Sequence, residues 1–95
     1  METQTIYAKL KEAESFLQQI PEEIRTLYKF KVTHTEYDSV VMSFRLHGDA
    51  YVGFLIERLK EVSVNKNEYS TYINIRTNGA DITLHENGYS HTTLL

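Results

Sequence analysis

The stretch TYINIRTNGADITLH, residues 71–85, decides how this chain folds. Two segments of alternating apolar residues flank Asn78-Gly79, the pair preferred in a type I′ hairpin turn, where both central residues need positive φ. Counting outward from this turn gives three cross-strand pairs: Arg76 with Asp81, Ile75 with Ile82, and Ile73 with Leu84. The apolar pairs share one face and the opposite charges meet beside the turn. The stretch therefore predicts an antiparallel hairpin of known register.

A second strand pair is predicted upstream. Residues 30–34 alternate in polarity, and residues 40–46 do so more strongly, with apolar side chains at every even position. This period of two is typical of half-buried strands. The polar link 35–39 is short enough for a hairpin loop.

Helices are predicted before and between these hairpins. Residues 6–20 carry an apolar stripe at helical spacing, with Thr3 or Thr5 as the N-cap. Pro21 then starts either a short second helix up to about residue 28 or a kinked continuation of the first. A third helix is expected from Gly48-Asp49 onward. Its apolar stripe consists of Val52, Leu55, Ile56, Leu59 and Val62.

The last segment, residues 87–95, is ambiguous. Asn87-Gly88 could form another two-residue turn, but that register sets Leu84 against His91 and Ile82 against Thr93, a poor match. We expect a weak edge strand or a loosely ordered end. The predicted order is α-α-β-β-α-β-β in a single domain, 1–95. The predicted fold class is α+β, a two-layer sandwich with helices on one face of a four-stranded antiparallel sheet.

Composition narrows the function. The chain has 95 residues, 41% of them hydrophobic, and a net charge of −3 with the signs interleaved, so nucleic acid is not expected as a partner. It has no cysteine, which excludes disulfides and thiolate chemistry and favours a reducing compartment. No apolar run is long enough to span a bilayer. A cytoplasmic location without membrane attachment is expected.

Four histidines are the obvious candidates for chemistry: His34, His47, His85 and His91. None has the spacing of a metal-ligand pair, although His85 and His91 could approach each other across a turn. The glycines do not cluster into a phosphate-binding loop, and no serine lies in a nucleophile elbow. The sequence therefore predicts no catalytic residue, no metal site and no cofactor, and favours a non-enzymatic role.

Seven tyrosines are the most unusual feature of the composition. In the predicted hairpin, Tyr72 shares a sheet face with Asn74 and Arg76, and Tyr69 and Tyr89 lie nearby. Tyrosine with arginine on an exposed face is typical of protein interfaces. The alternative is that these rings pack at the rim of the core with their hydroxyls in water. The candidate binding residues are Tyr69, Tyr72, Asn74, Arg76 and Tyr89.

The stretch from Phe44-Arg45-Leu46-His47 through Val62, followed by two strands, resembles the pterin-4a-carbinolamine dehydratase family over about half of the chain. The resemblance implies a sheet covered by helices and dimerisation through the sheet. The family's His-His-Pro motif is absent, because the corresponding loop reads Val64-Asn65-Lys66-Asn67-Glu68-Tyr69. No room remains after Ser90 for the family's final helix. No catalytic residue is therefore carried over.

Three functional hypotheses follow. The first is a non-enzymatic module that binds another protein, as an adaptor, an inhibitor or a phage or mobile-element regulator, with homodimer formation as a further option. The second is a divergent dehydratase, which needs histidines that converge on one pocket. The third is a sensor or sponge in which a dimer cleft lined by tyrosine and arginine binds a small ligand such as a nucleotide.

Overall fold

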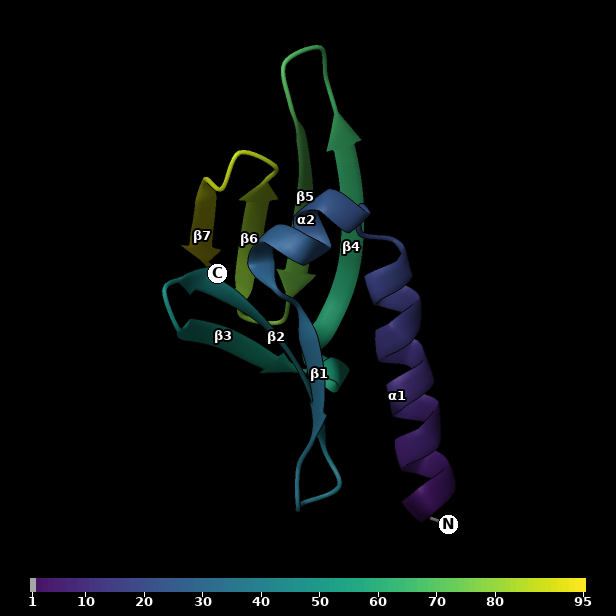
Figure 1. The fold of residues 1–95 in the computed structure, drawn as a ribbon. Helices are drawn as coiled ribbons and strands as arrows, with labels where there is room; N and C mark the ends of the chain where they lie inside the picture. The colour runs from purple at the N-terminus through teal and green to yellow at the C-terminus, as the bar shows by residue number, and fades with distance from the viewer. Residues whose placement is uncertain (1) are drawn as a thin grey trace.

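The computed structural model describes residues 2–95, without the side chains of residues 2–4 and 47. It is an α+β structure with two helices and two antiparallel sheets, one of three strands and one of four (Figure 1). The elements are α1 (Glu2–Gln18), α2 (Glu22–Tyr28), β1 (Lys31–His34), β2 (Val40–His47), β3 (Ala50–Leu55), the 3-10 turn η1 (Ile56–Arg58), β4 (Leu59–Lys66), β5 (Thr71–Thr77), β6 (Ala80–His85) and β7 (Ser90–Leu94).

Both N-terminal helices are confirmed. The predicted cap of α1 is wrong, because the helix already includes Thr3 and Thr5. Pro21 precedes α2, where its fixed φ suits a helix start, and Glu22 and Glu23 occupy the first turn. The helix ends at Lys29, whose left-handed backbone (φ 49°) lets its N–H bond the carbonyl of Arg25.

The predicted third helix is wrong: the stretch that also carries the family resemblance forms β3, η1 and β4. Gly48, with a φ of 54°, occupies the first of two loop positions between His47 and Ala50, so Gly48-Asp49 turns a hairpin instead of capping a helix. Within 50–55 the residues are uncharged, rich in β-formers and interrupted by Gly53, a composition that disfavours a helix.

The single four-stranded sheet is also wrong, because these extra strands divide the chain between two sheets. The first has the order β1-β2-β3 and the second β4-β5-β6-β7, so every strand pairs only with neighbours in sequence. The chain crosses from one sheet to the other through η1. The register shift between Leu59 and Glu61 marks a bulge at the start of β4.

The predicted register of the β5–β6 hairpin is confirmed at all three pairs, including Ile75 with Ile82. The predicted turn type is wrong, since neither Asn78 nor Gly79 has positive φ. The Thr77 hydroxyl closes the turn instead: it accepts the Ala80 N–H at 3.0 Å and donates to the Ala80 carbonyl at 3.1 Å. The carbonyl of Arg58 accepts the Asn78 N–H at 3.0 Å.

The C-terminal segment is an edge strand, which confirms the first of the two predicted alternatives, an edge strand or a loosely ordered end. Its pairing with β6 sets Leu84 against Ser90 and Thr83 against His91, one residue away from the two-residue-turn register. The loop has three residues, 86–88, and Gly88 (φ 90°) is its left-handed position. The His85 N–H closes it by donating to the Tyr89 carbonyl at 2.8 Å.

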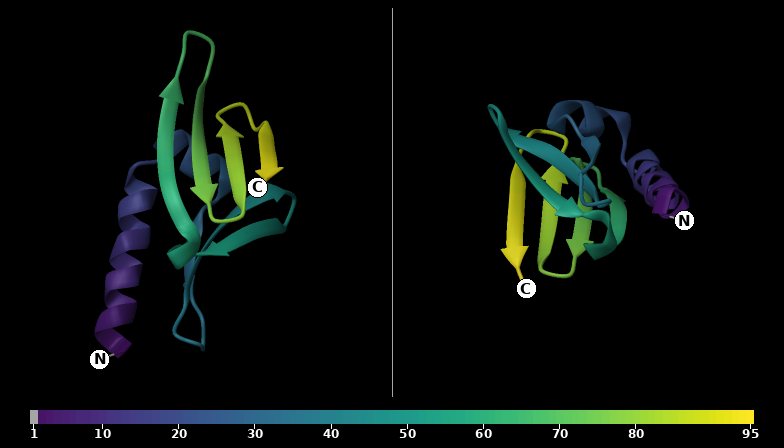
Figure 2. Two further views of the ribbon diagram at one scale, coloured as in Figure 1. Left: turned by 180° about the vertical axis from the view of Figure 1, so that it is seen from behind. Right: turned by 90° about the horizontal axis from the view of Figure 1, so that it is seen from below.

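The core lies where the inner faces of both sheets and the two helices meet (Figure 2). The ring of Phe44 is fully buried in it, and the partly buried ring of Phe30 packs against Phe44 with the centroids 5.5 Å apart. The buried apolar residues are Ala13, Ile20, Ile24, Tyr28, Val40, Met42, Phe44, Ile56, Leu59, Val62, Ile73, Ile75, Ile82 and Leu84. Among residues 2–95, neither helix is long and apolar enough to cross a membrane.

Candidate binding face

One face of the four-stranded sheet is polar and points away from the core. We call it the polar sheet face. Strand alternation and register place three cross-strand rows on it: Asn65, Tyr72 and His85; Ser63, Asn74, Thr83 and His91; and Glu61, Arg76, Asp81 and Thr93. The residues between them lie on the opposite face of the sheet, where Ile73 and Ile75 are fully buried in the core.

Three aromatic side chains stack at one end of this face. The rings of Tyr72 and His85, which pair across β5 and β6, have centroids 5.0 Å apart. Tyr89 from the following turn meets His85 edge-on at 5.3 Å. Such contacts hold the rings in place while Tyr89 stays 59% exposed. The stack forms an aromatic surface with Tyr89 at its exposed end.

Tyr28 supports this stack from the core side. Its hydroxyl, on α2, lies 2.9 Å from the carbonyl of His85 and 3.0 Å from that of Tyr89, so one donated proton is shared between the two ends of the loop. Burial raises the pKa of Tyr28, and the hydrogen bond to His85 offsets part of that rise. The loop that presents Tyr89 is thus fixed from behind.

Polar contacts order the rest of the face. Arg76 binds Asp81 with both Nε (2.9 Å) and an Nη (3.3 Å), and this contact raises the pKa of the guanidinium. Asn74 donates to the backbone carbonyl of Ile82 at 3.3 Å and to the Thr83 hydroxyl at 3.4 Å. The side chains of Arg76 and Asp81 remain partly exposed to solvent.

Three hairpin loops share one hydrogen bond: the backbone N–H of a tyrosine donates to a side-chain oxygen two residues earlier in the sequence. Asn67 Oδ1 accepts the N–H of Tyr69 at 2.8 Å, and Asn87 Oδ1 accepts that of Tyr89 at 2.9 Å. In the β1–β2 loop, Thr35 Oγ1 accepts the Tyr37 N–H at 3.3 Å. These turns fix the backbone beneath exposed rings. Tyr69 is 86% exposed and Tyr37 82%.

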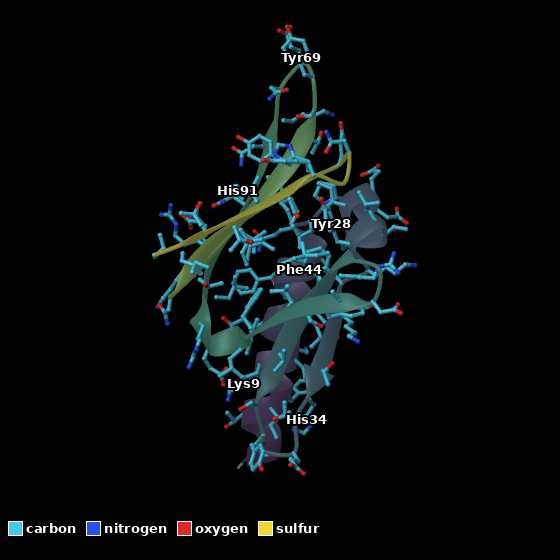
Figure 3. The ribbon with its side chains drawn as sticks, turned by 90° about the vertical axis from the view of Figure 1, so that its left-hand side faces the viewer. Lys9, Tyr28, His34, Phe44, Tyr69 and His91 are labelled. Atoms are coloured by element: carbon cyan, nitrogen blue, oxygen red, sulfur yellow. The ribbon has the colours of Figure 1, made fainter. Side chains whose placement is uncertain are left out.

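The tips of the β4–β5 and β6–β7 hairpins, which carry Tyr69 and Tyr89, lie toward one end of the molecule, and the β1–β2 loop lies at the other (Figure 1). Figure 3 shows Tyr69 at the far tip of the β4–β5 hairpin. The structure thus gathers Tyr72, Asn74, Arg76 and Tyr89 on one face. It sets Tyr69 beyond that face, at the end of the hairpin that forms half of it.

The histidines do not gather as a group. His85 and His91 both lie on the polar sheet face, in adjacent rows. His34 lies at the opposite end of the molecule, 3.6 Å from Asp38 (Figure 3). The side chain of His47 lies outside the described residues. Within the described part of the chain, no three His, Cys, Asp or Glu side chains form a cluster that could hold a metal ion.

A cavity of about 450 Å³ lies between the start of α2 and the β4–β5 hairpin. Its apolar lining comes from Pro21, Ile24 and Val64. Its charged lining consists of Glu23, Glu68, Glu86 and Lys66, with Tyr69 at the hairpin tip. The carboxylates outnumber the ammonium group, so the cavity favours cations over phosphates.

Sequence reasoning missed the part that His85 plays in the aromatic stack, although a signal was present. The same counting from Asn78-Gly79 that pairs Ile73 with Leu84 also pairs Tyr72 with His85. The place of Tyr89 required the length of the next loop, which was misjudged by one residue. The support from Tyr28 carried no sequence signal, since it joins residues 57 positions apart.

Comparison with known proteins assigns neither a family nor a function to the chain. No protein-family model, curated protein or solved structure matches the chain. Function therefore has to be argued from the geometry of the chain itself.

Proposed function

We propose that this chain is a small non-enzymatic module that binds another protein through the polar sheet face and the adjoining tyrosine tips. The observation that carries the proposal is the fixed aromatic stack of Tyr72, His85 and Tyr89 beside the Arg76–Asp81 pair. Tyrosine and arginine are the residues that most often carry binding energy at protein interfaces.

Preorganisation strengthens this proposal. Binding costs less when side chains and loops are already ordered, because less conformational entropy is lost on association. Ring stacking, the Tyr28 hydroxyl and the asparagine turns hold Tyr89 in place before any partner arrives. A surface of ordered tyrosines suits an adaptor, an inhibitor or a phage or mobile-element regulator better than it suits a reaction centre.

The other two hypotheses receive less support. Nucleotide binding in the 450 Å³ cavity is opposed by Glu23, Glu68 and Glu86, which repel phosphate. We expect no rise in the thermal midpoint with nucleotides. Dehydratase chemistry needs converging imidazoles, and His34 lies well apart from His91 (Figure 3).

The test is capture of partners from the native host with the immobilised 95-residue chain, quantified by mass spectrometry. The double substitution Tyr69→Ala/Tyr89→Ala removes two exposed rings and leaves the backbone carbonyl of Tyr89 for Tyr28. We expect it to weaken binding of the captured partner about 30-fold or more, the effect of losing an interface hot spot.

Tyr37→Ala is the matched control, because Tyr37 is about as exposed as Tyr69 and is held by the same kind of turn at the opposite end. It should bind like the wild-type chain. Capture of nothing above background, or equal loss with Tyr37→Ala, would contradict the proposed face.

A further inference from the structure

The free edge of β7 lacks the features that usually protect such edges. β7 is the last strand of its sheet, and residues 90–94 include neither a charged residue nor a proline, while four of the five are exposed. Natural edge strands are usually guarded by charges, prolines, bulges or a short length. The opposite edge, β4, has a bulge and carries Lys60, Glu61 and Lys66.

The edges of the other sheet are less suited to pairing. β1 has four residues and begins with Lys31. β3 is uncharged but has Gly53 within it, and glycine weakens strand pairing. Among the four edges, β7 is the one best able to accept another strand.

The hydrogen bonds of the β6–β7 ladder show which backbone groups of β7 are free. The N–H of His85 bonds the carbonyl of Tyr89, and the N–H of Leu95 bonds the carbonyl of Gly79. Bonded pairs alternate along an antiparallel ladder, so residues 91 and 93 also bond toward β6. Ser90, Thr92 and Leu94 therefore direct their N–H and C=O groups away from β6, along the open edge.

We propose that a second copy of this chain pairs with β7 in antiparallel register about a two-fold axis at Thr92. In this register Thr92 faces Thr92 of the second copy, and Ser90 faces its Leu94, so the free backbone groups of each strand meet those of the other. Threonine pairs stabilise neighbouring strands, and the absence of charge means that no like charges meet. The strand is thus complementary to itself, as a two-fold interface requires.

The apolar surroundings of β7 favour the same occupant. Leu94 and Leu95 are 82% and 71% exposed. Leu94 borders a groove of about 310 Å³, whose apolar lining includes Val52, Phe54 and Ile82. A second strand beside β7 covers part of this rim and removes apolar surface from water. Pairing also joins the two polar sheet faces into one continuous surface with His91 and Thr93 at its centre.

Thr92→Pro tests this pairing without disturbing the monomer. Its N–H points to the open edge, so proline removes no bond of the β6–β7 ladder. We expect sedimentation velocity to show a wild-type dimer that dissociates on dilution and a monomeric Thr92→Pro. Thr92→Ala should still dimerise, with a dissociation constant raised less than about fivefold, because it loses only the threonine side-chain pair. Thr92→Lys, which sets two ammonium groups opposite each other, should raise the dissociation constant at least about tenfold. Circular dichroism checks that each variant folds.

Amide hydrogen exchange gives a second, independent readout. In the dimer, the amides of residues 90, 92 and 94 should become protected as the concentration rises. A wild-type chain that stays monomeric at millimolar concentration overturns the inference, as does a folded Thr92→Pro that dimerises normally. If these amides are protected only when a different protein is added, the edge takes a foreign strand and self-pairing is wrong. If Thr92→Pro does not fold, the dissociation constant of Thr92→Lys and the amide exchange of the wild-type chain decide whether β7 pairs with itself.

Discussion

The hydroxyl of Tyr28 lies 2.9 Å from the backbone carbonyl of His85, and this contact ties α2 to the far side of the candidate binding face. The carbonyl of His85 is held from the core while its ring stacks on two tyrosines outside. One residue of β6 thus connects the packing of a helix to the order of the exposed aromatic surface.

Tyr28→Phe should test this connection. The ring stays buried, but two carbonyls lose their donor, so we expect a loss of about 1–2 kcal/mol in the free energy of unfolding by urea. Amide exchange in the 86–89 loop should accelerate. Unchanged exchange in this loop would show that Tyr28 does not order it.

Alkaline pH should reveal the same residue. Because the pKa of Tyr28 is raised in the folded state, its contribution to stability is complete below the usual value of 10.0 and is lost as the pH rises from there through the folded pKa. The free energy of unfolding should therefore fall more steeply above pH 10 in the wild-type chain than in Tyr28→Phe. Parallel curves would contradict this expectation.

A pair of glycine substitutions separates the two Asn-Gly turns. Gly88 has a φ of 90°, so Gly88→Ala should cost about 1–2 kcal/mol. Gly79 lacks positive φ, and a Cβ there meets nothing within 4 Å, so Gly79→Ala should be neutral or stabilise by up to about 1 kcal/mol. Thermal unfolding of both variants measures this. An equal loss in the two would indicate that a type I′ turn forms after all.

Glu57 predicts a weak acid dependence. The ion pair with Lys9, which joins η1 to α1, lowers the pKa of Glu57. Its contribution, about 0.2–1 kcal/mol for a partly exposed pair, is present above pH 4.5 and fades as the pH falls through the lowered pKa. Glu57→Gln should lower the free energy of unfolding by this amount above pH 4.5 and remove the part of its fall below pH 4.5 that Glu57 causes, whereas the control Glu36→Gln should keep both.

Because Ile75 lies in the core, shortening its side chain should lower the stability of the protein strongly. Ile75 is fully buried in β5, so Ile75→Ala should lower the free energy of unfolding by about 2–5 kcal/mol. Val64→Ala, on the same inner face but 44% exposed, should cost less than about 1 kcal/mol. Urea denaturation distinguishes the two. Similar losses would place the edge of the core elsewhere.

The β5–β6 hairpin was predictable because the turn position, the apolar pairs and the charge pair all agreed. The segment 50–62 was not, since Val52 and Ile56 fit both a helical stripe and strand alternation. Two features favour the strand: Gly53, which is visible in the sequence, and the positive φ of Gly48. The φ of Gly48 is known only from the structure, so apolar periodicity alone could not decide between helix and strand. Without β3 and β4, the remaining strands suggested one sheet. The binding-face residues on β5 followed from its register, whereas Tyr89 depended on a loop one residue longer than expected.

Both sheets pair only strands that are adjacent in sequence, and this bears on how the molecule acquires its structure. Contacts between nearby segments form quickly because little chain entropy is lost in closing short loops. Each hairpin can therefore assemble as it leaves the ribosome, in chain order. The bonds between α2 and the last turn span 57 and 61 residues, so these two bonds can form only after the loop that precedes the final strand has been made.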